Sequence, residues 1–385
     1  MKDDFIFSPK VSLESQVNQT LGQRETMEKY QRENRERLYN HLNNHLTSRS
    51  IDIGLLPEHI QQVVLPYLHF EGKLLRSTLL FLTCAAVGGD EEVATPAGAA
   101  IEVYHSATLI HDDIIDRSEK RRGHLTVYEQ LRQQFLKEIG YSEKEARHYG
   151  ISLGMLTGSM LQGMAISLLC DLYHHSTVDL KLVLHLVNEL TGDVQSKTLE
   201  GEALDVQYSK MSADNLNLDY ILKMMERKTG TLFSFAARAG AMIGLNAYDP
   251  DRPAVRMLSE FASRCAIAFQ LQDDILGIIG SEDATGKSVG SDLKEGKMTV
   301  ILYHSLTNAD SEQKAILAST IGNEAATKED IAKATEVLIE LGGVRYAQEL
   351  AKNYIRDATT LLGKVPLQRK ESLPAWAQYL VDRKS

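Results

Sequence analysis

The feature that most constrains the fold is an apolar, helix-forming segment that ends in closely spaced carboxylates. Residues 101–115 contain no Gly or Pro and lead into Asp112, Asp113 and Asp116. In a helix, Asp112 and Asp116 lie one turn apart on one face, where their charges repel each other. A hard cation such as Mg²⁺, which prefers carboxylate and phosphate oxygens, would make this pair tolerable in a buried cleft. The segment therefore predicts a helix that carries a metal site.

A second acidic pair lies far along the chain, in the segment FQLQDDILG. Asp273 and Asp274 are flanked there by apolar residues, as the first cluster is. A magnesium ion bound by a few carboxylates usually takes further ligands from substrate phosphates. We therefore predict that the two clusters face each other and hold a diphosphate between them through Mg²⁺.

Length and composition are those of a globular protein. A chain of 385 residues can bury a large core as one or two domains, and 43% hydrophobic with 24% charged residues argues against disorder. The net charge of −10 argues against a general nucleic-acid-binding protein. It does not exclude an anionic substrate, because a local basic pocket can outweigh a distant acidic surface.

The chain shows no sign of export or membrane insertion. Cys84, Cys170 and Cys265 are scattered through apolar context, without the short spacing of a disulfide framework or a zinc site, so we predict reduced core thiols. The first residues, MKDDFIFSPK, carry acidic groups too early for a signal peptide. No run approaches the ~20 apolar residues of a membrane span. These features predict a soluble, cytoplasmic protein without a transmembrane segment.

The periodicity of the chain predicts an all-α fold, a single large helical bundle. Strand-like runs between turn residues are nearly absent, and only 8 prolines interrupt the sequence. We divide the chain into a partly helical N-terminal extension (1–50) and a main domain (51–385). The expected helices are 24–46, 73–87, 94–115, 150–172, 179–209, 214–244, 251–280, 291–306, 311–321, 328–341 and 343–362.

Basic residues accompany the acidic clusters in a regular order. An arginine fork suits phosphate oxygens, and a lysine supplies a point charge. One such residue would more often be ordinary surface charge, but several beside two acidic pairs indicate an anion site. Lys73 and Arg76 are expected at i, i+3 on one side of a helix start. The others are Arg121, Arg122, Lys228, Lys287 and Lys297.

The ordered motifs resemble those of the trans-isoprenyl diphosphate synthases, also called the polyprenyl synthetase family. These motifs are GKLLR, YHSATLIHDDIID, RRG, KTG, FQLQDDILG and GKSVGSDLKEGKMT, and the resemblance extends from about residue 57 to the tail LPAWAQYLVDRK. It implies a bundle around a central cavity, usually as a homodimer, and an enzyme that joins an allylic diphosphate to isopentenyl diphosphate. Residues 51–385 would form this synthase domain.

The resemblance also implies residue roles. Asp112, Asp116 and Asp273 would bind three Mg²⁺ ions that clamp the allylic diphosphate, with Asp113 and Asp274 in support. The same diphosphate would contact Arg121, Lys228, Thr229, Gln270, Lys287 and Lys297. The diphosphate of isopentenyl diphosphate would contact Lys73, Arg76, His105 and Arg122. Without the motif, His105 would be interpreted as an ordinary core histidine.

Chain length is predicted from the helix before the first acidic cluster, where the family places the growing tail. Each helical turn is ~5.4 Å deep, close to one extended five-carbon unit. Ala107 and Thr108, one turn before Asp112, are too small to block a fifteen-carbon product, and Tyr104 could form the floor one turn lower. We expect a twenty-carbon geranylgeranyl product, with twenty-five carbons or more as the alternative.

Several residues depart from the common family pattern, namely Ser77, Tyr128, Ser159 and Gly277. None removes an expected ligand, but together they leave substrate choice and product length open. A class I terpene cyclase is the main alternative, although it has no second substrate for Lys73, Arg76 and Arg122. A non-catalytic partner subunit is disfavoured because the acidic clusters are intact.

Overall fold

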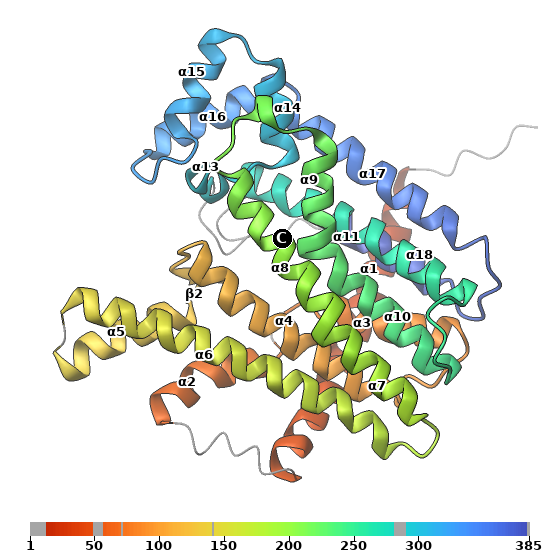
Figure 1. Cartoon of the computed structure of the whole chain (residues 1–385). Helices are drawn as coiled ribbons and strands as arrows, with labels where there is room; N and C mark the ends of the chain where they lie inside the picture. The colour runs from red at the N-terminus through yellow and green to blue at the C-terminus, as the bar shows by residue number, and fades with distance from the viewer. Residues whose placement is uncertain (1–12, 49–56, 71, 141, 281–289, 383–385) are drawn as a thin grey trace, which may run out of the picture.

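The two helices that carry the acidic clusters run through the interior of the protein. They are α4 (Thr95–Ile115) and α11 (Pro253–Ile279). α3 (Leu75–Ala86) packs against α4 and α10 (Thr231–Leu245), and α10 in turn packs against α11. Figure 1 shows these helices at the centre of the computed structural model, which describes residues 13–48, 57–70, 72–140, 142–280 and 290–382.

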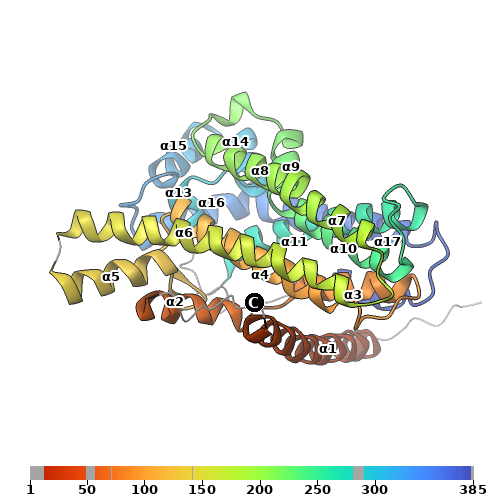
Figure 2. The ribbon, with the colours of Figure 1, turned by 60° about the horizontal axis from the view of Figure 1, so that its bottom comes forward.

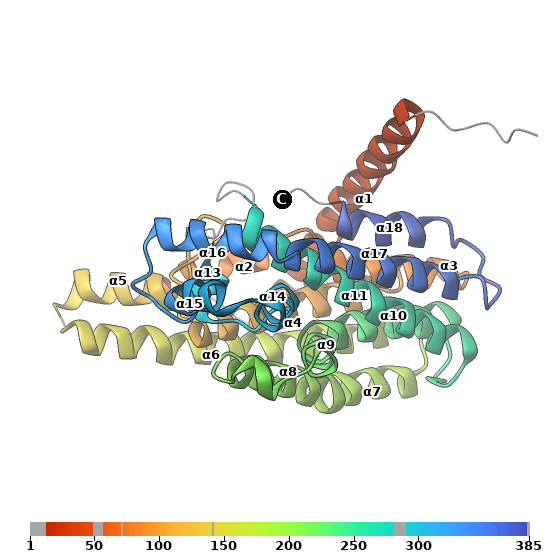
Figure 3. The same cartoon turned by 90° about the horizontal axis from the view of Figure 1, so that it is seen from above.

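Further helices cover this centre on two sides. In Figure 3, α6 (Glu143–Cys170), α7 (Leu180–Asn188) and α8 (Gln195–Tyr208) lie on one side, and α17 (Gly343–Leu361) and α18 (Ser372–Val381) on the other. α6 packs along α4, and α17 packs along α11. The expectation of an all-α bundle is therefore confirmed.

The N-terminal helix lies across the outside of the bundle. α1 (Leu13–Ser48) contacts α4 and α18, and Figure 2 shows it along the face below α3 and α4. Its buried side chains include Leu38 and Leu42, which join the main core. This helix starts earlier than the expected residue 24.

Short elements complete the described chain. A hairpin of two two-residue strands is the only strand pairing among the described residues, and it reverses the direction of the chain after α4. These elements are α2 (Glu58–Leu68), β1 (Lys120–Arg121), β2 (His124–Leu125), α5 (Val127–Ile139), η2 (Asp171–His174), η3 (Glu189–Val194), η4 (Ala213–Asn215), α9 (Leu218–Met225), η5 (Glu226–Gly230), α13 (Ser291–Glu295), α14 (Val300–Asn308), α15 (Ser311–Thr320) and α16 (Lys328–Glu340).

Local sequence signals explain where several helices begin and end. Ser142 and Glu145 form a capping box, so α6 begins at Glu143 rather than at the expected residue 150. The segment 214–244, expected as one helix, is divided into η4, α9, η5 and α10. The sequence predicted a helix from residue 73, with Lys73 at its start. In the structure α3 starts only at Leu75, so Lys73 lies in the turn before the helix.

The centre is apolar on nearly every face of its helices. All but one of the residues of α3 are buried, and α10 is buried almost throughout. A helix that is hydrophobic all round is typical of a protein interior. One helix, Glu143–His174, is long and apolar enough by composition to cross a membrane, although the sequence analysis expected none, and 44% of its most apolar window is buried inside the protein.

Candidate active site

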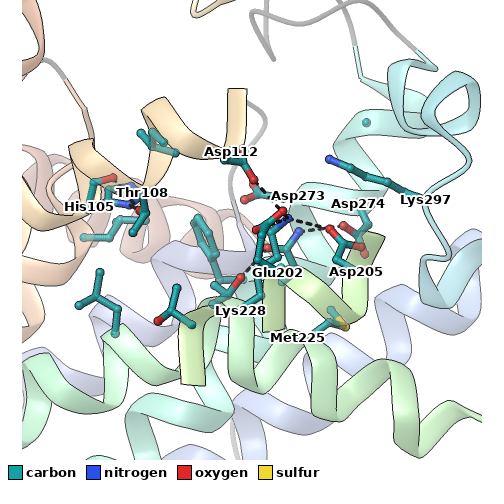
Figure 4. Close-up of a pocket in the computed structure, with 18 of the residues that line it drawn as sticks. His105, Thr108, Asp112, Glu202, Asp205, Met225, Lys228, Asp273, Asp274 and Lys297 are labelled. Atoms are coloured by element: carbon teal, nitrogen blue, oxygen red, sulfur yellow. Dashed lines mark hydrogen bonds and ion pairs between the residues drawn. The ribbon is translucent and has the colours of Figure 1, made fainter. Parts of the chain in front are cut away.

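A cavity of about 710 Å³ lies between the helices that carry the two acidic clusters. Asp112 of α4 and Asp273 of α11 both line it, and Figure 4 shows them near each other at its upper end. The prediction that the two acidic clusters share one cavity is therefore met by the geometry. Further polar lining residues come from α3, α8, η5 and α13, from β1 and from the turns that hold Lys73, Arg122 and Lys297.

The first acidic cluster occupies the last turn of α4. The guanidinium of Arg121, brought back by the β1–β2 hairpin, donates from Nε to Asp113 Oδ1 at 2.8 Å and from a terminal nitrogen to Asp112 Oδ2 at 2.8 Å. Burial opposes the charge of Arg121, but Asp113 and Asp112 outweigh it and raise its pKa. Asp113 is 1% exposed and serves as an internal partner of Arg121, while Asp112 reaches the cavity.

A second acidic surface on α8 faces this cluster, and the sequence analysis did not predict it. Glu202 and Asp205 line the cavity and share Lys228 of η5. Lys228 Nζ lies 3.0 Å from Glu202 Oε2, 2.7 Å from Asp205 Oδ2 and 3.2 Å from Asp112 Oδ1. Burial opposes the charge of Lys228, but the three carboxylates raise its pKa. The available signal was the i, i+3 acidic pair in GEALD next to a glycine.

The glycine beside this pair allows α8 and η5 to touch. A Cβ on Gly201 would overlap the backbone of Arg227 and Lys228, so only glycine permits the close approach of the two backbones. η5 is a single π-helical turn within an otherwise α-helical run, a feature often found at functional sites. The contact places Lys228 beside the α8 carboxylates.

Three of these carboxylates are arranged as metal ligands. Oxygen atoms of Asp112, Asp116 and Glu202 all lie within 4.8 Å of one another. An all-oxygen carboxylate set suits a hard divalent cation such as Mg²⁺. The residues present therefore fit the expected metal. Of the three predicted ligands, Asp112 and Asp116 belong to this group, Asp273 is not among its members, and Glu202 is an additional one.

The second acidic cluster combines one accessible and one buried carboxylate. Burial first, and the nearby carboxylate of Asp292 second, raise the pKa of Asp274 well above its ordinary value. Gln270 Nε2 donates to Asp274 Oδ1 at 2.9 Å, and Thr229 Oγ1 donates to Gln270 Oε1 at 3.0 Å. Asp273 lines the cavity beside them. This chain of hydrogen bonds ties η5 to α11.

Gly277, where the family often has a third aspartate, faces Asp292 of α13. A Cβ added at Gly277 would lie 2.8 Å from Asp292 Oδ2. Both residues line the cavity, so the carboxylate of Asp292 stands close to the space that a side chain at position 277 would enter.

Lys297 connects the end of α4 with α13 through two ion pairs. Its Nζ lies 2.6 Å from Asp116 Oδ2 and 3.1 Å from Glu295 Oε2. Burial opposes its charge, but Asp292 and Asp116 outweigh burial and raise the pKa of Lys297 well above its ordinary value. Lys287, the other lysine predicted from this loop, lies outside the described residues.

A second group of cations lines the same cavity. Lys73, Arg76 and Arg122 belong to it, and a Cβ on Gly72 would lie only 2.9 Å from a terminal nitrogen of Arg122. The Arg76 guanidinium lies 4.5 Å from the centroid of the Phe233 ring, and burial lowers its pKa to about 10. This group is the basic wall.

His105 lies on the α4 side of the basic wall. Burial first, and then the charges of Arg76 and Arg122, lower the pKa of His105 well below its ordinary value. The imidazole is therefore neutral at physiological pH, where it can donate one hydrogen bond and accept another. His105 lines the cavity, as the family resemblance implied.

Glu102 of α4 holds the start of α3. Its Oε1 accepts hydrogen bonds from the backbone N–H of Ser77 at 2.9 Å and from Ser77 Oγ at 2.8 Å. Leu74, at the N-cap of α3, supplies no side-chain cap, so the carboxylate of another helix satisfies one of the orphan donors. The common family proline at position 77 could make neither bond.

The three predicted chain-length residues divide between cavity and core. Thr108 lines the cavity with Leu109, whereas Tyr104 and Ala107 are buried and are not among its described lining residues. The lining positions of α4 are Glu102, His105, Thr108, Leu109 and Asp112. The cavity face of α4 is therefore rotated by about one residue, or ~100°, from the face that contains Tyr104.

Comparisons with known proteins agree with this architecture. Residues 57–338 match the family model described as polyprenyl synthetase. The chain belongs to the polyprenyl synthetase family. It is 33% identical over 316 residues to the geranylgeranyl diphosphate synthase of Saccharolobus solfataricus, covering 81% of this chain and 87% of that relative.

Two further proteins widen the comparison. The chain is 30% identical over 341 residues to the geranylfarnesyl diphosphate synthase of Aeropyrum pernix, covering 86% of this chain and 96% of the relative. A crystal structure of geranylgeranyl pyrophosphate synthase from Corynebacterium glutamicum, complexed with isoprenyl diphosphate and magnesium, superposes with a TM-score of 0.79 at 24% identity. That match covers 93% of this chain and 99% of the other. At this identity the superposition shows the shared fold.

Proposed function

We propose that this protein is a chain-elongating prenyltransferase that joins an allylic diphosphate to isopentenyl diphosphate, head to tail and in the trans configuration. The observation that carries the proposal is the single cavity. Its acidic wall, formed by Asp112, Glu202, Asp205 and Asp273 with their cationic partners, suits a metal-bound diphosphate, and its basic wall suits a second diphosphate. A class I terpene cyclase, which takes one diphosphate, has no use for the basic wall. The membership in the polyprenyl synthetase family supports the same conclusion.

The residues of the acidic wall would hold Mg²⁺ and the allylic diphosphate. We propose three ions on Asp112, Asp116 and Asp273, as the family resemblance implies, and Glu202 lies close enough to join them. When bound, the metal supplies positive charge to the leaving diphosphate oxygens. The diphosphate itself would contact Arg121, Lys228, Thr229, Gln270, Lys287 and Lys297.

The reaction requires no side-chain nucleophile. The C1–O bond of the allylic substrate breaks and its electron pair leaves with the diphosphate, while the isopentenyl double bond attacks C1. A proton is then lost to the departing diphosphate. Cations fixed around the leaving oxygens stabilise the charge that develops there, and the low-dielectric cavity strengthens this effect. Lys73, Arg76, His105 and Arg122 would position the isopentenyl diphosphate for attack.

We propose a twenty-carbon geranylgeranyl product, with twenty-five carbons as the alternative. Small Thr108 at the cavity wall leaves room beyond fifteen carbons. The named relatives include a geranylgeranyl and a geranylfarnesyl diphosphate synthase, which favours these two lengths. Tyr104 stays a candidate for the residue that limits product length. It is buried and is not among the described lining residues, so it would do so through the residues that line the cavity.

We also propose a homodimer in the cytoplasm. Leu156 of α6, Leu180 and Leu184 of α7 and Leu199 of α8 are each more than half exposed. α6, α7 and α8 lie on one side of the bundle (Figure 3), and exposed large apolar side chains there favour a protein–protein contact. A second copy would cover these side chains. Reduced cysteines agree with a cytoplasmic location.

Mass spectrometry of products tests the proposed function. Dimethylallyl, geranyl and farnesyl diphosphates are each incubated with isopentenyl diphosphate and Mg²⁺, and a twenty-carbon diphosphate is the expected main product. Conversion of an allylic substrate alone into hydrocarbon or alcohol would favour the cyclase. Tyr104→Ala should lengthen the product if Tyr104 is the floor, and Thr108→Phe should shorten it.

A further inference from the structure

The turn before α3 has a backbone that needs outside support. Phe70 and Leu74 adopt left-handed conformations, with φ of 55° and 51°. Such a conformation is unfavourable for a residue with a side chain, and it persists only where the surroundings enforce it. Both side chains are 3% exposed, which anchors the two ends of the turn in the core. Between them, Gly72 and Lys73 line the cavity.

The middle of this turn is held by a residue of the N-terminal helix. Arg35 of α1 donates from Nε to the carbonyl oxygen of Phe70 at 2.9 Å and from a terminal nitrogen to that of Gly72 at 2.8 Å. The planar guanidinium thus engages both carbonyls at once, a geometry that lysine cannot reproduce. Arg35 itself is not among the described residues of the cavity wall.

We propose that Arg35 is a positioning residue for the second substrate, isopentenyl diphosphate. α1 therefore contributes to substrate binding, although it lies outside residues 57–338, which match the family model. Arg35 fixes the turn that carries Lys73 and leads into Arg76 of α3, the residues that meet the diphosphate of isopentenyl diphosphate. The inference rests on the proposed function, because it concerns the basic wall of the same cavity.

The direction of the two carbonyl groups explains why loss of Arg35 should weaken the binding of isopentenyl diphosphate. Each carbonyl carries a partial negative charge on oxygen, and Arg35 directs both oxygens to a group outside the cavity. If the turn relaxed, these oxygens could rotate toward the anion and oppose its binding. Hydrogen bonds from a charged donor are about twice as strong as neutral ones, so the fork is able to hold the strained turn.

Steady-state kinetics of Arg35→Ala, with Arg35→Lys as a second variant, test the proposal. For Arg35→Ala we expect the KM for isopentenyl diphosphate to rise about tenfold, while the KM for the allylic substrate and kcat stay within about threefold. Arg35→Lys keeps the charge without the fork, and we expect a rise of about fivefold. Arg32→Ala, an exposed arginine one turn earlier on α1, is the matched control and should behave like the wild type.

Several outcomes would overturn the inference. They are an unchanged KM for isopentenyl diphosphate in Arg35→Ala, an equal rise of both KM values, or wild-type behaviour of Arg35→Lys, which would leave only a charge effect. If Arg35→Ala fails to fold by circular dichroism, Arg35→Lys alone decides. A wild-type protein that elongates no allylic substrate would refute the proposed function itself, whereas normal elongation with indifferent Arg35 variants refutes only this inference.

Discussion

The cations on the two walls of the cavity differ in whether they form ion pairs with protein carboxylates. On the acidic wall, Arg121, Lys228 and Lys297 each lie within 3.2 Å of at least two carboxylates. On the basic wall, Arg76 rests on the Phe233 ring and forms no ion pair with any carboxylate of the described chain. The cations of the acidic wall are held in ion pairs, while Arg76 of the basic wall feels the carboxylates of Glu102 and Asp273 without pairing with either.

This difference separates two kinds of binding. Metal and diphosphate at the acidic wall must take the place of existing ion pairs, so binding there is an exchange of partners. At the basic wall, an anion meets the partly buried guanidinium of Arg76 and gains a charge-assisted contact there without breaking an ion pair of Arg76. Variants of the acidic wall should therefore affect metal dependence and kcat, and variants of the basic wall should affect the KM for isopentenyl diphosphate.

Asp112→Asn should have the largest effect, because Asp112 contacts both Arg121 and Lys228 and belongs to the metal-ligand group. We expect kcat to fall by about 10³-fold, the scale of a lost transition-state contact. Asp193→Asn, an exposed aspartate paired with Lys197, is the control and should leave kcat unchanged. A loss below about tenfold in Asp112→Asn would remove Asp112 from the proposed metal site.

Arg76→Ala should raise the KM for isopentenyl diphosphate by about 100-fold, because the diphosphate loses the charge-assisted hydrogen bonds that the Arg76 guanidinium donates. The KM for the allylic substrate should stay within about threefold. Arg76→Lys should recover part of the loss, because it restores charge without the fork. Parallel changes in both KM values would contradict the division of labour between the two walls.

Glu202→Gln should weaken Mn²⁺ binding by about tenfold, because it replaces a charged oxygen ligand with an amide of the same shape. Isothermal titration in the presence of inorganic diphosphate measures this without turnover. Glu200→Gln, on the same helix but paired with Arg227, is the matched control. Unchanged affinity in Glu202→Gln would mean that Glu202 serves only as a partner of Lys228.

His105→Gln should have the smallest effect, on the pH dependence of stability. The folded pKa of His105 lies below the ordinary value of 6.5, so the unfolded chain binds a proton that the folded chain does not. The stability contributed by neutral His105 is thus present above pH 6.5 and is lost as pH falls below it. Chemical denaturation of both proteins between pH 7.5 and 5 should show a shallower decline for His105→Gln; identical slopes would contradict the assignment.

The sequence predicted the cavity carboxylates that sit in compact motifs and missed those that do not. Asp112 and Asp273 come together as expected, because each motif lies on a helix whose apolar face specifies its place in the core. Glu202 and Asp205 were missed because an acidic pair on a helix usually faces solvent, and only the π-helical η5 brings Lys228 against them.

The depth of the cavity was harder to predict for a related reason. Counting back whole turns from Asp112 selected Tyr104, but the described cavity face of α4 runs through His105. An error of one residue rotates a helix face by ~100°. Packing against α3 and α6 sets this rotation, and no local pattern in α4 records it.

The widened turn of η5 adds one residue to what would otherwise be a regular helix leading from α9 into α10. Its wider winding lets Lys228 and Thr229, neighbours in sequence, serve different elements: the first contacts α8 and the second hydrogen-bonds to α11. Deleting a single residue here would remove the extra residue that the π-helical turn accommodates and restore regular α-helical winding. The widened turn would then no longer hold Lys228 against the α8 carboxylates, so the spacing of this turn is as much a part of the site as the side chains it presents.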